Sequence, residues 1–136
     1  MKKIILSIAV ISSALLADIA VVVNPGAGVD ALDEGQVKKI FMAKSKKFPN
    51  GSAVVPIDQN SDNGAYATFY DKVVGKSPGK MNKYWVKLTF TGKAEAPKKV
   101  GGDSDVIGLV KSNKNMIGYV DAGAVTGDVK VVYTVK

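Results

Sequence analysis

A short apolar run near the N-terminus constrains the fold most strongly. It reads Ile-Ala-Val-Val-Val at positions 19–23 and ends at Asn24-Pro25-Gly26. β-Branched residues favour strands, and a strand that is apolar at every position needs cover on both faces of its sheet. We therefore expect a buried strand in a sheet that carries helices on both sides.

Helical and strand patterns then alternate along the chain. Asp33 and Gln36 have the spacing of a capping box, and Val37, Ile40 and Phe41 form the apolar stripe of a helix over 33–43. The same reasoning predicts strands at 53–57, 116–120 and 129–135 and helices at 65–74, 80–88 and 105–112. This order predicts one small, three-layer-like α/β domain over residues 18–136, with a mixed sheet flanked by helices.

Residues 1–17 are interpreted as a signal peptide. Met1-Lys2-Lys3 is a basic start, residues 4–16 are mostly apolar, and Ala17 suits a cleavage site. The apolar stretch is shorter than the roughly 20 residues that span a bilayer, although an uncleaved anchor is the alternative. We expect an exported protein that meets the membrane only through this segment before cleavage, and the absence of cysteine excludes a lipoprotein.

The composition argues against several classes of function. The formal charge is +7, every cationic side chain is lysine, and the chain has no arginine, histidine or cysteine. Cysteine nucleophiles, Ser–His pairs and Cys/His zinc sites are therefore excluded, and we expect no enzyme, metal or cofactor. Asp58, Asn60 and Asp62 do not have the spacing of a defined calcium loop. Absence of arginine, together with export, argues against nucleic-acid binding.

A polar loop, residues 58–64, is the candidate binding site. It ends in Asn63-Gly64 at the predicted start of a helix, where unpaired N–H groups and the helix dipole favour an anion. Gly64 would let a ligand approach the backbone, and Ser61 and Asn63 could donate hydrogen bonds. An ordinary capped connection between strand and helix is the alternative, and it also explains the carboxylates near helix starts at 58, 62, 103 and 105. The sequence Gly-Gly-Asp-Ser at 101–104 is a weaker version of the same pattern.

Two single residues carry further expectations. Trp85 is expected to anchor a helix in the core rather than to bind a ligand. Gly118, within an apolar strand, indicates a close backbone approach, either in packing or where the chain crosses between lobes.

Taken together, these segments resemble the periplasmic phosphate-binding proteins, the substrate-binding components of phosphate ABC transporters. The resemblance covers residues 19–121. It rests on the order and spacing of Val21-Val22-Val23-Asn24, the helix 32–43, Phe48-Pro49-Asn50-Gly51, the segment 54–69, Trp85 and Ile117-Gly118-Tyr119-Val120. It implies one lobe of a type II periplasmic-binding-protein fold, a periplasmic location, and a phosphate-like anion as ligand.

The candidate loop departs from the family pattern. Where the family shows Arg followed by Ser-Gly-Thr, this sequence has Gln59 followed by Asn63, Gly64 and Ala65, so only the glycine is kept. The resemblance implies Gln59, Asn63, Gly64 and Ala65 as ligand-binding residues, and the hydrogen-bonding side chain of Ser61 adds a fifth candidate from the loop itself. Charge-assisted hydrogen bonds are about twice as strong as neutral ones, so we expect weak phosphate binding or a different ligand.

Two functions follow from the resemblance. The first is an exported solute-binding-like module for phosphate or another small anion, which could serve an ABC permease. The second is a ligand-less structural or interaction protein of the cell envelope, which would use the same lobe as a partner-binding or homodimer surface. Family members close two lobes on phosphate, and we expect no second lobe in this chain.

Overall fold

The computed structural model of the protein describes residues 18–135, so the predicted signal peptide lies outside the described residues. Strands and helices alternate over most of the chain. They are β1 (Ile19–Val23), α2 (Glu34–Phe41), β2 (Val55–Asp58), α3 (Gly64–Phe69), the π-helical η1 (Tyr70–Val74), α4 (Pro78–Phe90), β3 (Lys98–Lys99), α5 (Asp103–Ser112), β4 (Met116–Asp121), the 3-10 turn η2 (Ala122–Ala124) and β5 (Lys130–Val135).

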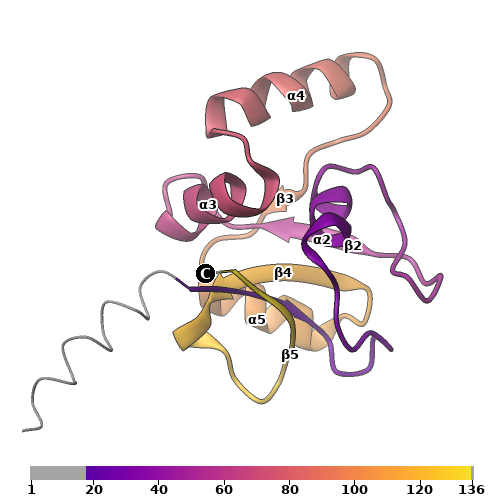
Figure 1. Ribbon diagram of the computed structural model, residues 1–136, viewed down its shortest axis with the longest axis vertical. Coiled ribbons are helices and arrows are strands. Elements are labelled where there is room, and N and C mark those ends of the chain that lie inside the picture. The colour runs from indigo at the N-terminus through magenta and orange to yellow at the C-terminus, as the bar shows by residue number, and fades with distance from the viewer. Residues whose placement is uncertain (1–17, 136) are drawn as a thin grey trace, which may run out of the picture.

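The five strands form a mixed sheet in the order β3-β2-β4-β1-β5. β2 runs parallel to β3 and β4, whereas β1 runs antiparallel to β4 and β5. Ile19 at the start of β1 is opposite Asp121 at the end of β4, and Val23 is opposite Ile117. The carboxyl ends of β2 and β4 therefore lie at the same edge of the sheet as the beginning of β1 (Figure 1).

The side chains of β1 divide between two cores, as its continuous apolar run predicts. Ile19, Val21 and Val23 pack in the larger cluster, together with apolar residues of α2, α3, η1 and α4. Ala20 and Val22 pack in the smaller cluster, against α5. Helices thus cover both faces of the sheet, and the prediction of a mixed α/β sheet is confirmed.

Aromatic rings dominate the larger core. Phe69 stacks on Tyr119 with ring centroids 4.0 Å apart, and Phe41 meets Phe69 edge-on at 4.8 Å. Such pairs contribute more than their buried area alone. These rings join α2 and the end of α3 to β4.

Helix α4 lies at one end of the molecule, beyond α2 and α3 (Figure 1). Ser77 caps its start by accepting a hydrogen bond from the Lys80 N–H, and Pro78 occupies the first turn. Met81 and Trp85 are its buried residues, so the expectation that Trp85 anchors a helix in the core is confirmed. The helix continues to Phe90, two residues beyond the predicted end.

Other local predictions differ from the structure in detail. The first helix has the predicted capping box but covers 34–41 rather than 33–43. The helix predicted at 65–74 continues from α3 into a π-helical segment, which apolar spacing does not reveal. The two-residue β3 was missed because its exposed lysines carry no strand pattern.

Gly118 allows α5 to pack closely on β4. A Cβ atom at this position would lie 2.5 Å from Cγ1 of Val106 and 3.2 Å from Cγ1 of Ile57. The close backbone approach expected from the sequence is therefore a packing contact.

Candidate functional site

A pocket of about 610 Å³ lies at the sheet edge where β2 and β4 end. In open α/β sheets, ligands bind outside the carboxyl ends of the strands. The pocket lies between the start of α3, the start of α5 and the end of β4. Its lining residues are Ile19, Gln59, Asp62, Asn63, Gly64, Ala65, Thr68, Gly102, Asp103 and Asp121.

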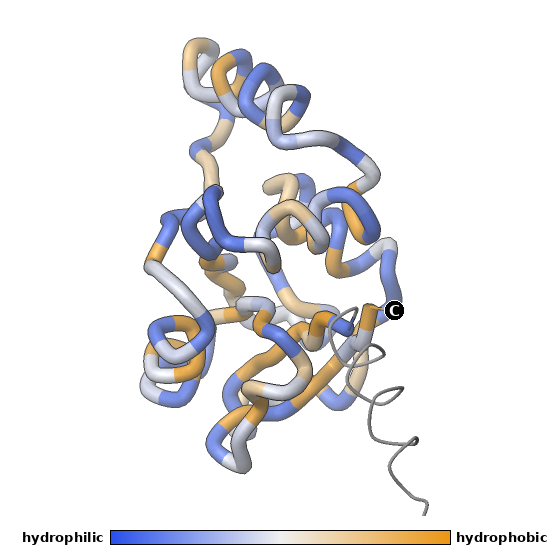
Figure 2. The backbone as a smooth tube through the Cα atoms, turned by 90° about the vertical axis from the view of Figure 1, so that its left-hand side faces the viewer, coloured by the Kyte–Doolittle hydropathy of each residue, from blue (hydrophilic) through white to orange (hydrophobic). Residues whose placement is uncertain are grey.

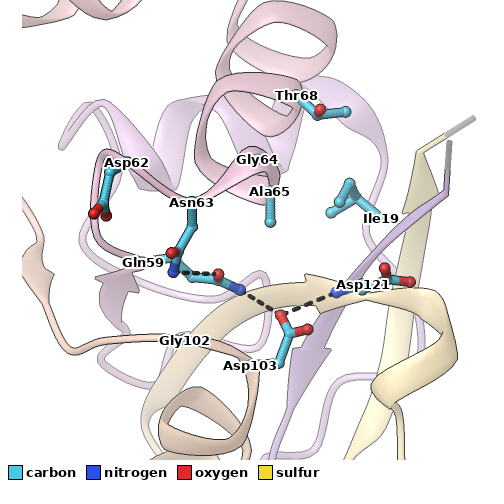
Figure 3. Close-up of a pocket in the computed structure, with 10 residues that line it drawn as sticks. All are labelled: Ile19, Gln59, Asp62, Asn63, Gly64, Ala65, Thr68, Gly102, Asp103 and Asp121. Carbon is cyan, nitrogen blue, oxygen red and sulfur yellow. Dashed lines mark hydrogen bonds between the residues drawn. The ribbon is translucent and has the colours of Figure 1, made fainter. Parts of the chain in front are cut away.

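Gln59 lies at the centre of a hydrogen-bond network in this pocket (Figure 3). Its Nε2 donates to Oδ1 of Asp103 at 2.7 Å and to the carbonyl oxygen of Tyr119 at 2.9 Å. Its Oε1 accepts from Nδ2 of Asn63 at 3.2 Å. Gln59 is only 2% exposed, so burial and these partners hold its amide in one orientation.

Asn63 precedes α3 but does not cap it. The residue has the extended backbone of an N-cap, yet its side chain makes no capping hydrogen bond. Its Nδ2 instead donates to Gln59 and to the carbonyl oxygen of Gly101 at 3.1 Å. The first N–H groups of α3 thus receive no side-chain cap from Asn63, and Gly64 and Ala65 border the pocket.

The second predicted loop, at 101–104, borders the same pocket. Gly102 is the N-cap of α5, and its N–H donates to the side chain of Asp105, which closes the first turn. Asp103 points into the pocket, where its Oδ1 accepts from Gln59 and, at 3.2 Å, from the backbone N–H of Asp121 (Figure 3). Two loops that are about 40 residues apart in sequence therefore form one site.

Asp58 directly precedes Gln59 at the end of β2 and is 2% exposed. Its carboxylate accepts hydrogen bonds from the hydroxyl groups of Tyr70 and Tyr119, the shortest of them at 2.8 Å. Burial raises the pKa of Asp58 to about 6, although these two hydroxyls and the charge of Lys99 act in the opposite direction. Burial and the neighbouring carboxylate also raise the pKa of both tyrosines.

The role of Asp58 differs from the capping role considered from the sequence. It ends β2 and accepts from two core hydroxyls rather than from a helix start. Of the other carboxylates, Asp105 bonds back to the N–H of Gly102 as capping predicts, whereas Asp103 joins the pocket network.

The pocket combines N–H donors with carboxylate acceptors. Gly64 and Ala65 present the start of α3 on one side, and Asp62, Asp103 and Asp121 contribute carboxylates. None of the lining residues is a lysine. Such a site favours a ligand that accepts hydrogen bonds from N–H groups and also donates them to carboxylates, and it disfavours a multiply charged anion.

Most of the predicted site residues lie in this pocket. Gln59, Asn63, Gly64 and Ala65 line it, whereas Ser61 is not among the lining residues. Sequence reasoning missed Asp121 and Thr68. Asp121 is the last residue of the buried strand β4, a position that could have marked it, whereas Thr68 carries no such signal.

The remaining chemistry is limited in the part of the chain that the structure describes. Residues 18–135 contain no group of three or more Asp or Glu side chains arranged to hold a metal ion. Over the same residues, no helix is long and apolar enough to cross a membrane.

Solved structures of binding proteins share this fold. A phosphate ABC transporter substrate-binding protein from Clostridium perfringens, solved with bound phosphate, superimposes with a TM-score of 0.68 at 20% identity over 84% of this chain and 43% of its own. An ABC-type phosphate transport receptor from Vibrio cholerae gives 0.67 at 19% identity, over 86% and 46%. PstS from Borrelia burgdorferi gives 0.63 at 14% identity, over 84% and 46%.

The chain has the fold of one lobe of these proteins. It spans less than half the length of each of these three solved chains. No protein-family model matches the sequence, and a search of curated proteins gives no match. At these identities the likeness establishes the fold of the lobe alone.

Proposed function

We propose that this protein is an exported, periplasmic binding module that takes a small oxyanion in its protonated, singly charged form. The observation that carries the proposal is the uncapped start of α3 at Gly64 and Ala65, which faces the carboxylate of Asp103 across the pocket. Binding of phosphate by the Clostridium perfringens protein supports the choice of a phosphate-like ligand. Export would depend on residues 1–17.

The carboxylates of the pocket determine which protonation state of the ligand we expect to bind. A singly charged oxyanion can accept from the N–H groups of α3 and donate a hydroxyl hydrogen to Asp103. Doubly charged phosphate keeps one hydroxyl hydrogen, but its second negative charge is repelled by the carboxylates of Asp103 and Asp121. Without an arginine to clamp the anion, the affinity should be modest.

Calorimetric titration with inorganic phosphate at low salt tests this function. We expect saturable binding that weakens as phosphate passes from its singly to its doubly charged form with rising pH. Gly64→Val should abolish binding, because a Cβ at Gly64 meets no protein atom within 4 Å, so the side chain can be accommodated where the anion would lie. Gly108→Ala, on the exposed side of α5, is the control that should leave binding unchanged.

A second function is favoured by one specific observation. The Nε2 and Oε1 atoms of Gln59 already form hydrogen bonds with protein groups, so Gln59 offers no free hydrogen-bonding group to an incoming ligand. The lobe would then act without a ligand, as a surface for a partner protein, a permease or a second copy. No heat at millimolar phosphate, from protein shown to be folded, would favour this function over anion binding.

A further inference from the structure

A second surface, distant from the pocket, combines exposed apolar and basic side chains. Lys83, Val86, Lys87 and Phe90 follow one another at helical spacing, so they share one side of α4, which we call the outer face of α4. Val86 is 59% exposed and Phe90 is 90% exposed. These two large apolar side chains lie four residues apart on one face of the helix and so form a small exposed apolar patch.

The opposite side of α4 explains why this face points outward. Met81 and Trp85 are buried against the core, and the hydroxyl of Tyr84 donates to the carbonyl oxygen of Met42 at 2.8 Å. These contacts determine the rotation of the helix about its axis. Val86 and Phe90 are therefore presented to solvent by a helix that is anchored on its other side.

The charge around this face has one sign. Lys80 and Lys93 add to the two lysines of the outer face, and no Asp or Glu occurs between Lys72 and Ala94. Among residues 18–135, the ion pairs join Lys111 to Asp128 and Lys130 to Asp30, and neither involves a lysine of α4. Figure 2 shows hydrophilic and hydrophobic positions alternating along this helix at the top of the view.

We propose that the outer face of α4 docks on an anionic lipid surface. Val86 and Phe90 would enter the boundary between headgroups and acyl chains, and the lysines would lie among the anionic headgroups. A helix with apolar side chains and flanking lysines on one face has the features of an interfacial helix. Lysine suits this role, because its long stem carries a hydrated point charge that needs no fixed geometry from its partner.

Two other occupants fit the surface less well. A symmetric dimer through this face would bring Lys83 and Lys87 of both copies together, and like charges oppose such contact. A stable protein interface covers about 800 Å² on each partner, whereas this apolar surface consists of two side chains.

Vesicle binding tests the proposal directly. The exported protein is mixed at low salt with vesicles of phosphatidylglycerol and phosphatidylcholine, or of phosphatidylcholine alone, and the bound fraction is measured by sedimentation. We expect binding only to the anionic vesicles, and weaker binding as salt is added. Trp85 is the single tryptophan and lies in α4, so its fluorescence should respond when this helix meets the lipid.

Matched variants distinguish binding through the outer face of α4 from non-specific attraction between a basic protein and an anionic surface. Lys83→Gln with Lys87→Gln should weaken binding about 25-fold, because each lysine near an anionic surface contributes about fivefold. Phe90→Ser should weaken it about tenfold or more through lost apolar burial. The controls are Lys111→Gln with Lys114→Gln, which changes the net charge equally, and Val131→Ser, which removes an exposed apolar side chain of β5. All these proteins carry the same N-terminus.

Three results would overturn the proposal. These are equal losses in the control variants, equal binding to uncharged vesicles, or no vesicle binding at all by folded protein. If the protein instead forms a dimer that Phe90→Ser dissociates, as seen by light scattering, a second copy is the occupant and the lipid proposal is also rejected.

Discussion

At the pocket, Asp58 and Gln59 are each 2% exposed and bonded to tyrosines, an asparagine, a carboxylate and the backbone. On α4, by contrast, Lys83, Val86, Lys87 and Phe90 are exposed, and only the opposite side of the helix is packed. Buried polar groups need partners, whereas exposed groups have water. Substitutions at the pocket should therefore change stability, and substitutions on the outer face of α4 should change binding alone.

The largest expected difference lies between two phenylalanines. Phe69→Ala should cost about 3–5 kcal/mol of unfolding free energy, because Phe69 is fully buried and stacks on Tyr119. Phe90→Ala should change it by less than about 0.5 kcal/mol. Urea unfolding at constant pH measures both, and similar losses in the two variants would contradict the comparison.

The pH dependence of Asp58 should be the next largest effect. Burial raises the pKa of this carboxyl from 3.8 to about 6, so the folded state holds the proton more tightly than the unfolded chain. The contribution of Asp58 to the unfolding free energy is therefore fully present below about pH 4 and is lost as the pH rises through about 6. The unfolding free energy of Asp58→Asn, which does not titrate at this position, should therefore rise relative to that of the wild type by roughly 2–3 kcal/mol as the pH goes from 4 to 8.

Urea unfolding of both proteins at several pH values measures that difference. A difference that stays constant over this range would show that Asp58 does not titrate differently in the folded and unfolded states. Tyr70→Phe offers a second check, because it removes a donor to the carboxylate and should raise the pKa of Asp58 further.

Gln59→Leu should have an intermediate effect of about 1–3 kcal/mol. It leaves the Tyr119 carbonyl without its Gln59 donor and removes one donor to Asp103. Thermal unfolding measures the loss of stability. Asn82→Ala, at an exposed position of α4, is the matched control and should change the stability little. Equal stability of Gln59→Leu and the wild type would mean that the network adds no net stability.

Ser77→Ala should lower the unfolding free energy by about 1 kcal/mol, at the low end of the range expected for Gln59→Leu. It removes the side chain that caps α4 by accepting from the Lys80 N–H. Because α4 is held to the rest of the molecule mainly by Met81, Tyr84 and Trp85, the variant should fray the helix start while the sheet persists. Hydrogen exchange can test this, and protection lost equally in α4 and β4 would contradict it.

Local patterns were sufficient for much of the fold. The apolar run at 19–23 predicted a strand covered on both faces, and Asp33 with Gln36 predicted the capped start of α2. Gly118 predicted a close approach, which the structure shows against Val106. Each of these inferences depends on a residue and its near neighbours in sequence, or on burial of a whole element.

Only the tertiary structure decided how the candidate site is composed. Sheet topology brings the loops at 59–65 and 101–103 together, and no local pattern encodes which strands are neighbours. Asp58 was expected to cap a helix, but in the structure it accepts hydrogen bonds from the buried hydroxyl groups of Tyr70 and Tyr119. These partners are 12 and 61 positions away in the chain, so local sequence does not reveal them. The sequence by itself determined the elements and their apolar faces, whereas long-range packing decided the partners of each buried polar group.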